Sequence, residues 1–356
     1  MTEATATARA DRLAGLLEER GLDCLLVTDL VNVRYLTGFT GTNGACIVGP
    51  EERLFLTDFR YVSRAEDEVR GFDRVRAGRD MLADIARRLE GRAGFDDDHV
   101  TVKAHAKLAE HSEAELVPAG GLVERLREVK DENELRAIAD AARLADEVFE
   151  LVAERGLAGR TERDVALFAE QAMRERGADD PSFPAIVAAG PNGALPHAVP
   201  RDVEIPSAAL VVIDMGARLD GYCSDCTRTL ATGELDGTAR AVYDLVLTAQ
   251  ETALEAVRPG AGRKQLDSLA RELIDTAGHA EHFGHGLGHG VGLEVHEEPR
   301  LAQSGEGELE AGNVVTVEPG VYLPGELGVR IEDLVVVGED GFEVLTHFPK
   351  TLVTTD

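Results

Sequence analysis

The sequence predicts an α/β protein with two consecutive domains. Its 356 residues exceed the size at which a single hydrophobic core usually stops growing. Segments with strand and helix patterns alternate along the chain, and the clearest cluster of breaking residues, at residues 118–121, separates two such series. We therefore expect an α/β domain over residues 1–121 and a second domain, of mixed α/β (α+β) type, over residues 122–356.

The elements expected in the first half are short. Leucines on one side of residues 6–20 predict a helix, and Gly21 is placed to end it. Residues 24–27 and 54–58 are apolar enough for buried strands, and a helix is expected to open at Tyr61. Further strands and helices follow up to the breaking cluster, as in a compact α/β domain.

The second half opens with helices. Apolar residues recur at helical spacing over residues 122–155, and Asp131 or Asn133 is expected to interrupt them and give two helices. Thr161 with Asp164 resembles a capping box for the next helix. Beyond it we expect a loop over residues 192–201, helices over residues 237–257 and 263–277, and strands over residues 289–295, 313–318 and 329–337.

Two aspartates lie in a segment that has the pattern of one hairpin. The β-branched run at residues 210–213 is typical of a buried strand, and residues 219–221 supply a turn. With that turn Asp214 and Asp225 fall nearly opposite each other, where like charges destabilise a ladder and a buried carboxylate needs a partner or a proton. A cation between them would resolve both problems. The alternative is that one aspartate ends a strand and the other caps a turn.

A glycine-rich tract carries three histidines. Glycines alternate through residues 284–292, which argues against an ordinary helix or strand and for backbone packed closely against a neighbour. His285, His289 and His296 lie in or next to this tract. A solvated loop would explain a single histidine, but it explains poorly three histidines among alternating glycine and apolar residues.

Two glutamates interrupt apolar runs further along. Glu318 ends the run VVTVEP, and Glu332 lies inside VRIEDLVVV beside Arg330. Each glutamate alone could be a strand-end charge or half of an ion pair. With the two aspartates they place four acids on predicted core strands, which packing tolerates only with cations. Oxygen ligands with a minority of histidine favour Mn²⁺, Co²⁺, Fe²⁺ or Zn²⁺, and four carboxylates can hold two ions about 3.5 Å apart with a shared hydroxide.

The charge balance limits the partners. With 66 acidic and 37 basic residues the net charge is −29, which disfavours nucleic acid and anionic membranes. Lysine occurs only five times. An acidic surplus with few lysines predicts a halophilic protein that is kept soluble at high salt, and the alternative is an ordinary acidic cytosolic protein from a GC-rich genome.

The cysteines and the chain start predict the setting. Four cysteines are too few for a disulfide framework, and Cys223 and Cys226 would face opposite sides of a strand, which weakens a zinc or redox interpretation. No apolar run approaches a membrane span, and residues 1–10 lack the features of a signal peptide. We therefore expect a reducing, cytoplasmic setting.

The order Asp, Asp, His, Glu, Glu in its local contexts resembles the metallopeptidases of the pita-bread fold. The segments are VVIDMGA, CSDCTRT, GHGLGHGVGLEVHE, TVEPGVY and VRIEDLV, and within that fold they are most similar to the Xaa-Pro peptidases, prolidase and aminopeptidase P. The segments VRYLTGFTGTNGACIV and FLTDFRY resemble the creatinase-type amino-terminal domain of the same group. The resemblance covers nearly the whole chain and implies a creatinase-like α/β domain followed by a pita-bread catalytic domain.

The resemblance implies a dinuclear site for two divalent metal ions, Mn or Co before Zn or Fe. The implied ligands are Asp214, Asp225, His289, Glu318 and Glu332. Asp225 and Glu332 would bridge the ions, and Glu318 would also help to activate a shared water and transfer its proton. The implied reaction is hydrolysis of the bond between an N-terminal residue and a following proline, in a homodimer.

The resemblance implies roles for further residues around the ligands. His197, in LPHAVP, would steady the tetrahedral intermediate, and His296 would face the scissile carbonyl and the leaving nitrogen. His285 would lie behind the ligands, and Arg330 would orient Asp225 or Glu332 and, like His197 and His296, contact the substrate. Two residues depart from the usual pattern. Cys226 occupies the variable position inside the SDxTRT motif, and Arg201 follows Pro200 where a small polar residue is common. Neither is an implied ligand, but the pattern does not define the edge of the substrate pocket at Arg201.

Three other functions share parts of this pattern. Methionine aminopeptidase has the five ligands, but the extra N-terminal half argues against it. Creatinase has both domains and the histidines but lacks these ligands. A non-catalytic binding protein on the same fold would typically have lost ligands, and all five stand here. The sequence does not distinguish dipeptide substrates from longer peptides.

Overall fold

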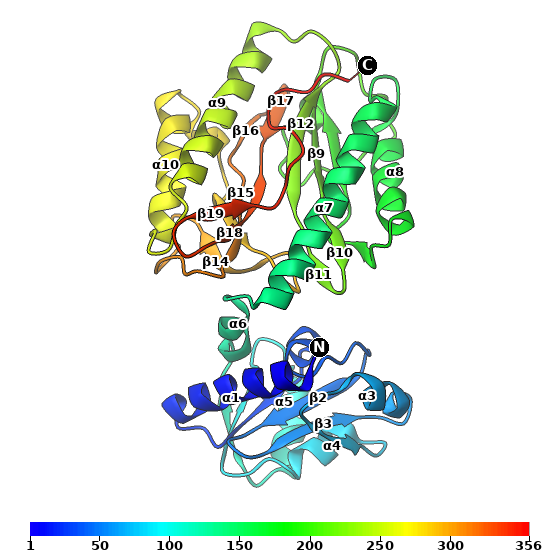
Figure 1. The fold of residues 1–356 in the computed structure, drawn as a ribbon, viewed down its shortest axis with the longest axis vertical. Coiled ribbons are helices and arrows are strands. Elements are labelled where there is room, and N and C mark those ends of the chain that lie inside the picture. Colours follow the sequence, from blue (N-terminus) through cyan, green and yellow to red (C-terminus); the bar gives the residue numbers. More distant parts are fainter. Residues whose placement is uncertain (356) are drawn as a thin grey trace. The chain divides into compact units, whose positions relative to one another are not determined.

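We describe residues 1–355 from a computed structural model of the chain (Figure 1). Contacts divide the chain into two compact units, Met1–Arg127 and the part from Glu128 onward. The expected mixed α/β class is confirmed. The domain boundary after residue 121 remains a prediction, and helix α6 (Leu122–Arg127) begins just beyond it. Among the residues described, no helix is both long and apolar enough to cross a membrane.

The first unit is built on a six-stranded sheet. Its strands are β1 (Cys24–Val27), β2 (Gly44–Val48), β3 (Arg53–Thr57), β4 (Asp73–Arg76), β5 (Arg92–Phe95) and β6 (Glu115–Pro118). Its other helices are α1 (Glu3–Arg20), α2 (Leu30–Thr37), α3 (Val62–Glu68), α4 (Met81–Ala86) and α5 (Val102–His111). The sheet order is β4-β3-β2-β1-β5-β6, with β1 antiparallel to β2 and parallel to β5. Gly21 ends α1 as expected, at a φ of 63° that glycine adopts without strain.

The second unit contains four helices of three or more turns around several small sheets. The helices are α7 (Glu132–Arg155), α8 (Glu162–Glu175), α9 (Gly237–Glu255) and α10 (Arg263–Thr276), with short 3₁₀ turns η1 (Gly190–Asn192) and η2 (Ala280–His282). In Figure 1, α7 and α8 lie on one side of the strands and α9 and α10 on the other. The two largest hydrophobic cores of this unit lie one under each helix pair.

The strands of the second unit pair within four small sheets. The strands are β7 (Asp180–Pro181), β8 (Ile186–Ala189), β9 (Leu210–Met215), β10 (Ala217–Leu219), β11 (Tyr222–Cys223), β12 (Cys226–Ala231), β13 (Gly288–Gly290), β14 (Glu297–Leu301), β15 (Val314–Val317), β16 (Gly320–Leu323), β17 (Leu327–Arg330), β18 (Asp333–Val337) and β19 (Phe342–Val344). The sheet orders are β11-β10-β7, β12-β9-β8, β14-β13-β15-β18-β19 and β16-β17.

The break between α6 and α7 has a clear local cause. The Asp131 side chain accepts hydrogen bonds from the backbone N–H groups of Asn133 and Glu134, and the Glu134 side chain accepts from the backbone N–H of Asp131. This reciprocal pair is a capping box that satisfies free N–H groups at the start of a helix. The expected interruption near Asp131 is confirmed.

The aspartate hairpin differs from the expectation in its register. Asp220 and Gly221 form its tight turn with φ values of 49° and 77°. Strand β9 then pairs with β12 so that Asp214 lies opposite Thr227 rather than Asp225. Asp225 comes just before β12, diagonally across the ladder from Asp214 and on the same face, because side chains two residues apart share a face. The expectation that the two aspartates lie nearly opposite each other was therefore wrong by two residues of strand register.

The strands expected near the C-terminus are shorter than predicted. The segment 329–337 is divided at Ile331 and Glu332 into β17 and β18, which belong to different sheets. The Glu332 N–H donates to the carbonyl of Thr227 at 3.1 Å instead of to a neighbouring strand in its own sheet. Of the strand expected over residues 289–295, only the first residues belong to β13. Glu332 therefore lies at a break between strands, where its side chain is free to turn inward.

Candidate metal centre and active site

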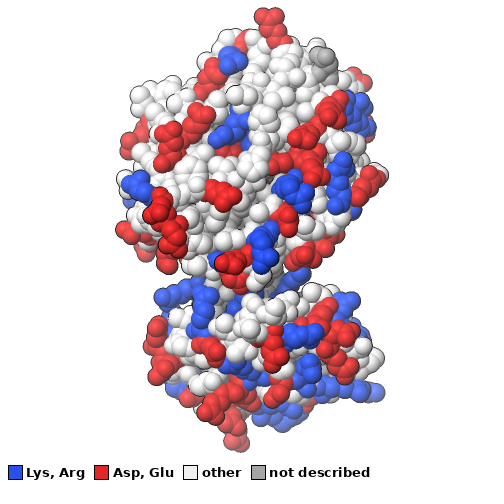
Figure 2. All heavy atoms as spheres, viewed as in Figure 1, with Lys and Arg blue, Asp and Glu red and all other residues white. Residues whose placement is uncertain are grey.

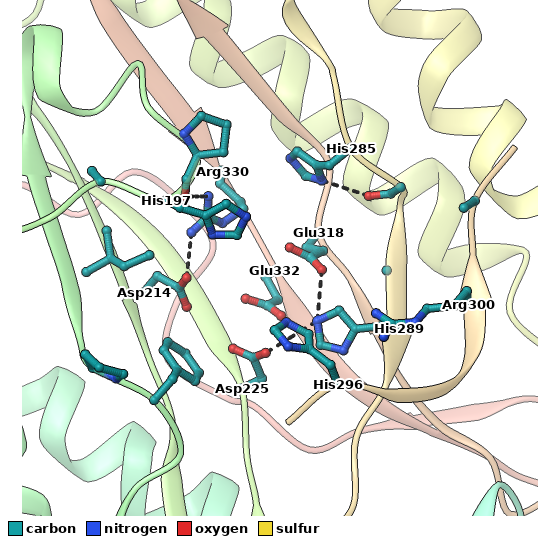
Figure 3. Close-up of a pocket in the computed structure, with 18 of the residues that line it drawn as sticks. His197, Asp214, Asp225, His285, His289, His296, Arg300, Glu318, Arg330 and Glu332 are labelled. Carbon is teal, nitrogen blue, oxygen red and sulfur yellow. Dashed lines mark hydrogen bonds and ion pairs between the residues drawn. The ribbon is translucent and has the colours of Figure 1, made fainter. Parts of the chain in front are cut away.

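A cavity of about 620 Å³ in the second unit gathers the residues selected from the sequence. Figure 3 shows their side chains projecting into it from separate strands and loops. The cavity is lined by all eight predicted site residues: His197, Asp214, Asp225, His289, His296, Glu318, Arg330 and Glu332. His285 lines it as well. The tertiary structure thus brings together side chains that are more than 130 positions apart in the chain.

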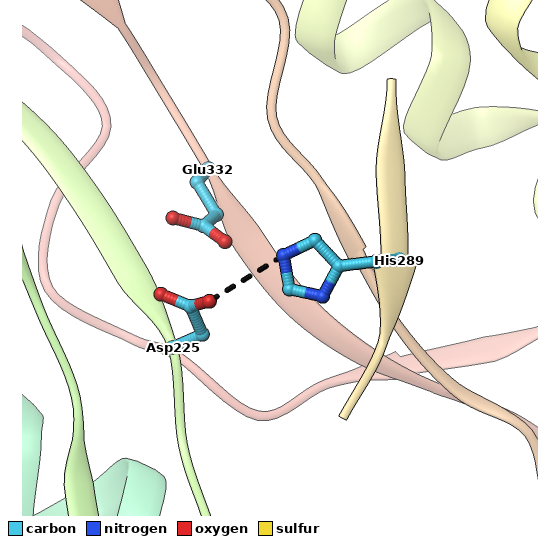
Figure 4. A group of neighbouring side chains, drawn as sticks. All are labelled: Asp225, His289 and Glu332. Carbon is cyan, nitrogen blue, oxygen red and sulfur yellow. Dashed lines mark ion pairs between the residues drawn. The ribbon is translucent and has the colours of Figure 1, made fainter. Parts of the chain in front are cut away.

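The innermost group is Asp225, His289 and Glu332 (Figure 4). One ligand-type atom from each lies within 4.8 Å of the others, and all three residues are buried. The Nε2 atom of His289 is 3.6 Å from Oδ2 of Asp225 and 3.2 Å from Oε1 of Glu318. Two carboxylates therefore face one imidazole nitrogen.

The backbone of the glycine tract fixes the direction of His289. Nδ1 of His289 is 3.1 Å from the carbonyl oxygen of Gly290, so this nitrogen carries the hydrogen in the neutral ring. A Cβ atom at Gly288 would lie 1.9 Å from the carbonyl oxygen of Thr316, so only glycine allows β13 to approach β15 this closely. The remaining nitrogen, Nε2, then directs its lone pair at carboxylate oxygens. Such an arrangement requires a proton or a metal ion between them.

The charges in this group oppose one another. Burial raises the pKa of Asp225 well above its usual range, and the charges of Glu332 and Asp214 raise it further. Burial, followed by the charges of Glu318 and Asp214, likewise raises the pKa of Glu332. Burial also raises the pKa of Glu318, but its hydrogen bond with His289 and the nearby positive charges outweigh that effect and lower the value to about 2. Without a cation these acids cannot all ionise favourably.

Among the described residues that line the cavity, two buried side-chain oxygen atoms have no hydrogen-bond partner. They are Oδ1 of Asp214 and Oε1 of Glu332. The second oxygen of each carboxylate is bound, at 2.6 Å to Nη2 of Arg330 and at 2.8 Å to Oγ1 of Thr227 respectively. A buried polar atom without a partner is costly, and bound divalent cations would supply the missing partners. The residues present therefore fit a metal site with mainly oxygen ligands.

Arg330 orients a different acid from the one expected. Its guanidinium binds Asp214, not Asp225 or Glu332, so that expectation was wrong. Its other donors reach Oγ1 of Thr227 at 2.9 Å, the hydroxyl oxygen of Tyr322 at 2.8 Å and the carbonyl oxygen of Pro196 at 3.1 Å. Most of its N–H groups are thus committed to the protein, which makes Arg330 a residue that positions Asp214 more than one that grips substrate.

Four histidines line the cavity around the acids. His289 and His296 pack edge to face with ring centroids 4.4 Å apart. Burial, with the charges of His289 and Arg300, lowers the pKa of His296 to about 4, so its ring is neutral near pH 7. His285 donates or accepts a hydrogen bond with the Tyr322 hydroxyl at 3.0 Å, and burial lowers its pKa. Figure 3 shows His197 on the Asp214 side of the cavity.

Three further residues of the site, Tyr322, Thr227 and Arg300, were not predicted from the sequence. Tyr322 and Thr227 link Arg330 to the histidine tract and to Glu332. Arg300 lines the cavity on β14, and its guanidinium makes no hydrogen bond or ion pair with any residue of the described chain. The exposed arginine in the alternating segment EEPRL, close behind His296, was a usable signal, because a cation on such a strand can face the same cavity as the histidines.

The matched family models agree with this geometry. Residues 136–339 match the model for metallopeptidase family M24. The chain belongs to this family. Residues 9–129 match the creatinase/prolidase N-terminal domain, so both expected domain types are confirmed. As an M24 protein it is a peptidase of the pita-bread fold.

Individual relatives resemble the M24 chain over nearly its full length. An uncharacterized peptidase, YqhT of Bacillus subtilis, is 40% identical to this chain, and the aligned region covers 97% of this chain and 99% of the relative. The solved structure of a Xaa-Pro dipeptidase from Bacillus anthracis has a TM-score of 0.96 and 38% identity, with 98% of this chain and 99% of that chain covered. An X-Pro aminopeptidase from Thermotoga maritima has a TM-score of 0.89 and 34% identity, with 98% and 100% covered.

Proposed function

We propose that this chain is a Xaa-Pro dipeptidase that uses two divalent metal ions to hydrolyse the bond between an N-terminal residue and a following proline. The observation that carries the proposal is that Asp225, His289 and Glu332 meet in one cavity that also holds unsatisfied oxygen atoms. Arg300, whose guanidinium is unpaired within residues 1–355, lines the same cavity. The names of the Bacillus anthracis and Thermotoga maritima relatives support the same bond specificity.

Five cavity residues are suited to hold the ions. They are Asp214, Asp225, His289, Glu318 and Glu332. Bound ions would polarise the scissile carbonyl and generate a nucleophile from water near neutral pH. Carboxylate ligands with one imidazole favour Mn²⁺ or Co²⁺, with Zn²⁺ and Fe²⁺ as alternatives.

The chain's own groups would handle protons and orientation. Glu318 is ionised, since its pKa is lowered to about 2, and we assign it the role of taking the proton from the attacking water and returning it to the leaving nitrogen. His296 is neutral and can offer a hydrogen bond near the leaving nitrogen without adding charge. His197, facing it across the cavity, would stabilise the oxygen of the tetrahedral intermediate.

Arg300 favours dipeptides over longer peptides. A dipeptide places its free carboxylate one residue beyond the scissile bond, and a guanidinium binds a carboxylate through two parallel N–H groups. Arg300 is unpaired within the described chain and lines the same cavity as the proposed ligands. A tripeptide would present a neutral amide at that point and lose this contact.

Hydrolysis by chelated enzyme, with Mn²⁺, Co²⁺ or Zn²⁺ restored, tests the proposal. We expect activity on Xaa-Pro to exceed activity on Xaa-Pro-Yaa. The Arg300→Met variant should raise KM for Xaa-Pro at least about tenfold, as expected for a lost charged hydrogen bond, and change Xaa-Pro-Yaa little. Arg258→Met is the matched control, because Arg258 is exposed and does not line the cavity. Equal or better cleavage of Xaa-Pro-Yaa would favour the second candidate, an Xaa-Pro aminopeptidase.

We also propose a cytoplasmic homodimer adapted to salt. The chain has 66 acidic and 37 basic residues, and Figure 2 shows acidic side chains on the visible face of both units, interspersed with basic and uncharged ones. The four cysteines are free and buried, as suits a reducing compartment. Size-exclusion chromatography with light scattering tests the dimer, and a monomer would contradict it.

A further inference from the structure

The loop that carries His197 is poorly held by apolar packing. It spans residues 190–201 and brings His197 to the cavity (Figure 3). Its two large aliphatic side chains point outward, with Leu195 57% and Val199 75% exposed. Because little apolar area of these side chains is removed from water, the position of the loop depends strongly on polar contacts.

A single carboxylate joins the two ends of this loop. Glu162, the first residue of α8, has a side chain only 1% exposed. At the start of the loop its oxygens accept the backbone N–H of Ala189 and the side-chain amide of Asn192, both at 2.9 Å. At the end of the loop they accept the backbone N–H of Arg201 at 2.9 Å and two guanidinium N–H groups of Arg201 at 3.0 Å each. Five donors therefore meet on one buried group.

The tip of the loop has an independent attachment to the site. The carbonyl oxygen of Pro196 accepts a hydrogen bond from Nη1 of Arg330, the residue that also binds Asp214. Near the start of the loop, a Cβ atom at Gly328 of β17 would lie 1.8 Å from the carbonyl oxygen of Gly193, which shows how closely the two backbones approach. With the base closed by Glu162 and the tip bound by Arg330, His197 has little freedom to shift.

We propose that Glu162 and Arg201 are positioning residues for the reaction, which hold the His197 loop closed at its base. The inference rests on the proposed role of His197. Arg201 at the edge of the pocket therefore has a structural partner, because its guanidinium binds Glu162 and not the substrate. A misplaced His197 would weaken stabilisation of the tetrahedral intermediate more than it weakens substrate binding. The reason is that the charge on the intermediate's oxygen develops only during the reaction, and His197 must lie next to that oxygen to stabilise it.

The test measures kcat and KM of the Mn²⁺-loaded enzyme on a Xaa-Pro dipeptide. Arg201→Ala should lower kcat on the order of tenfold with KM nearly unchanged. Arg201→Lys, which restores one charged contact, should recover part of the loss. In a His197→Ala background, Arg201→Ala should have no further effect on kcat, because the two changes act on one step. An unchanged kcat, or an equal loss in both backgrounds, overturns the proposal.

Hydrogen exchange of the metal-free protein tests the clamp without any activity. Backbone amides of residues 190–201 should exchange faster in Arg201→Ala, and faster still in Glu162→Gln, whose amide NH₂ group would replace one acceptor oxygen and face two or three of the five donors. Arg163→Ala is the matched control, because Arg163 is exposed on the same helical turn and its side chain makes no hydrogen bond within the described chain. Unchanged exchange in Arg201→Ala overturns the proposal. If the wild type cleaves no Xaa-Pro bond but exchange responds as expected, the proposed function fails while the clamp stands.

Discussion

Replacing Arg330 by methionine should expose how much the fold depends on charge balance in the cavity. Arg330 is 4% exposed, and its Nη2 atom lies 2.6 Å from Oδ2 of Asp214. Methionine fills similar space but leaves Asp214 buried without its cation. Removing one partner of a buried ion pair typically costs about 3–5 kcal/mol. Removing both charges, in Arg330→Met with Asp214→Asn, should cost clearly less than the sum of the single changes.

Urea unfolding of metal-free protein measures this cost. The chain has no tryptophan, so unfolding is followed by circular dichroism. The loss in Arg330→Met should be smaller with saturating Mn²⁺, because a bound cation replaces part of the missing positive charge next to Asp214. Arg143→Met, which breaks only exposed pairs on α7, should cost less than about 0.5 kcal/mol. A cost below about 1 kcal/mol for Arg330→Met, or one that Mn²⁺ does not reduce, would refute the reasoning.

Three further predictions concern metal, pH and salt. Asp225→Ala should abolish hydrolysis while the circular dichroism spectrum is kept, and an active variant would overturn the metal assignment. Asp225 and Glu332 have pKa values raised in the folded chain, so the metal-free fold holds protons that the unfolded chain releases, and its stability should fall as pH rises above about 4.5. For two such groups, the free energy of unfolding should change by at most about 2.7 kcal/mol per pH unit. Urea unfolding in the presence of chelator should show this dependence on pH, and saturating Mn²⁺ should reduce it strongly. Equal slopes with and without Mn²⁺ would contradict the mutual repulsion of these acids. The melting temperature should rise in molar KCl, and no rise would remove the halophile hypothesis.

Local features of the fold were readable from the sequence where short-range chemistry decides them. Gly21 ends α1 because a left-handed residue is needed there, and Asp131 starts α7 because its side chain caps free N–H groups. The close packing of the glycine tract was also predictable, since Gly288 has no room for a side chain against Thr316. The ends of strands were harder to predict from the sequence. The apolar run continues through Glu332, although the strand pairing is interrupted there.

The sequence by itself determined which side chains are candidates for the metal site. Acids inside apolar runs are rare enough to be recognised one at a time, and their order with His289 is specific. Only the tertiary structure decided which of their atoms meet. Arg330 reaches Asp214 across 116 positions of the chain, and Glu162 binds both ends of the His197 loop from the start of α8, where the capping pattern predicts a helix but not this partner. The physical reason is that periodicity fixes the face on which a side chain lies, whereas partners far apart in sequence are chosen by strand register and by the path of the loops.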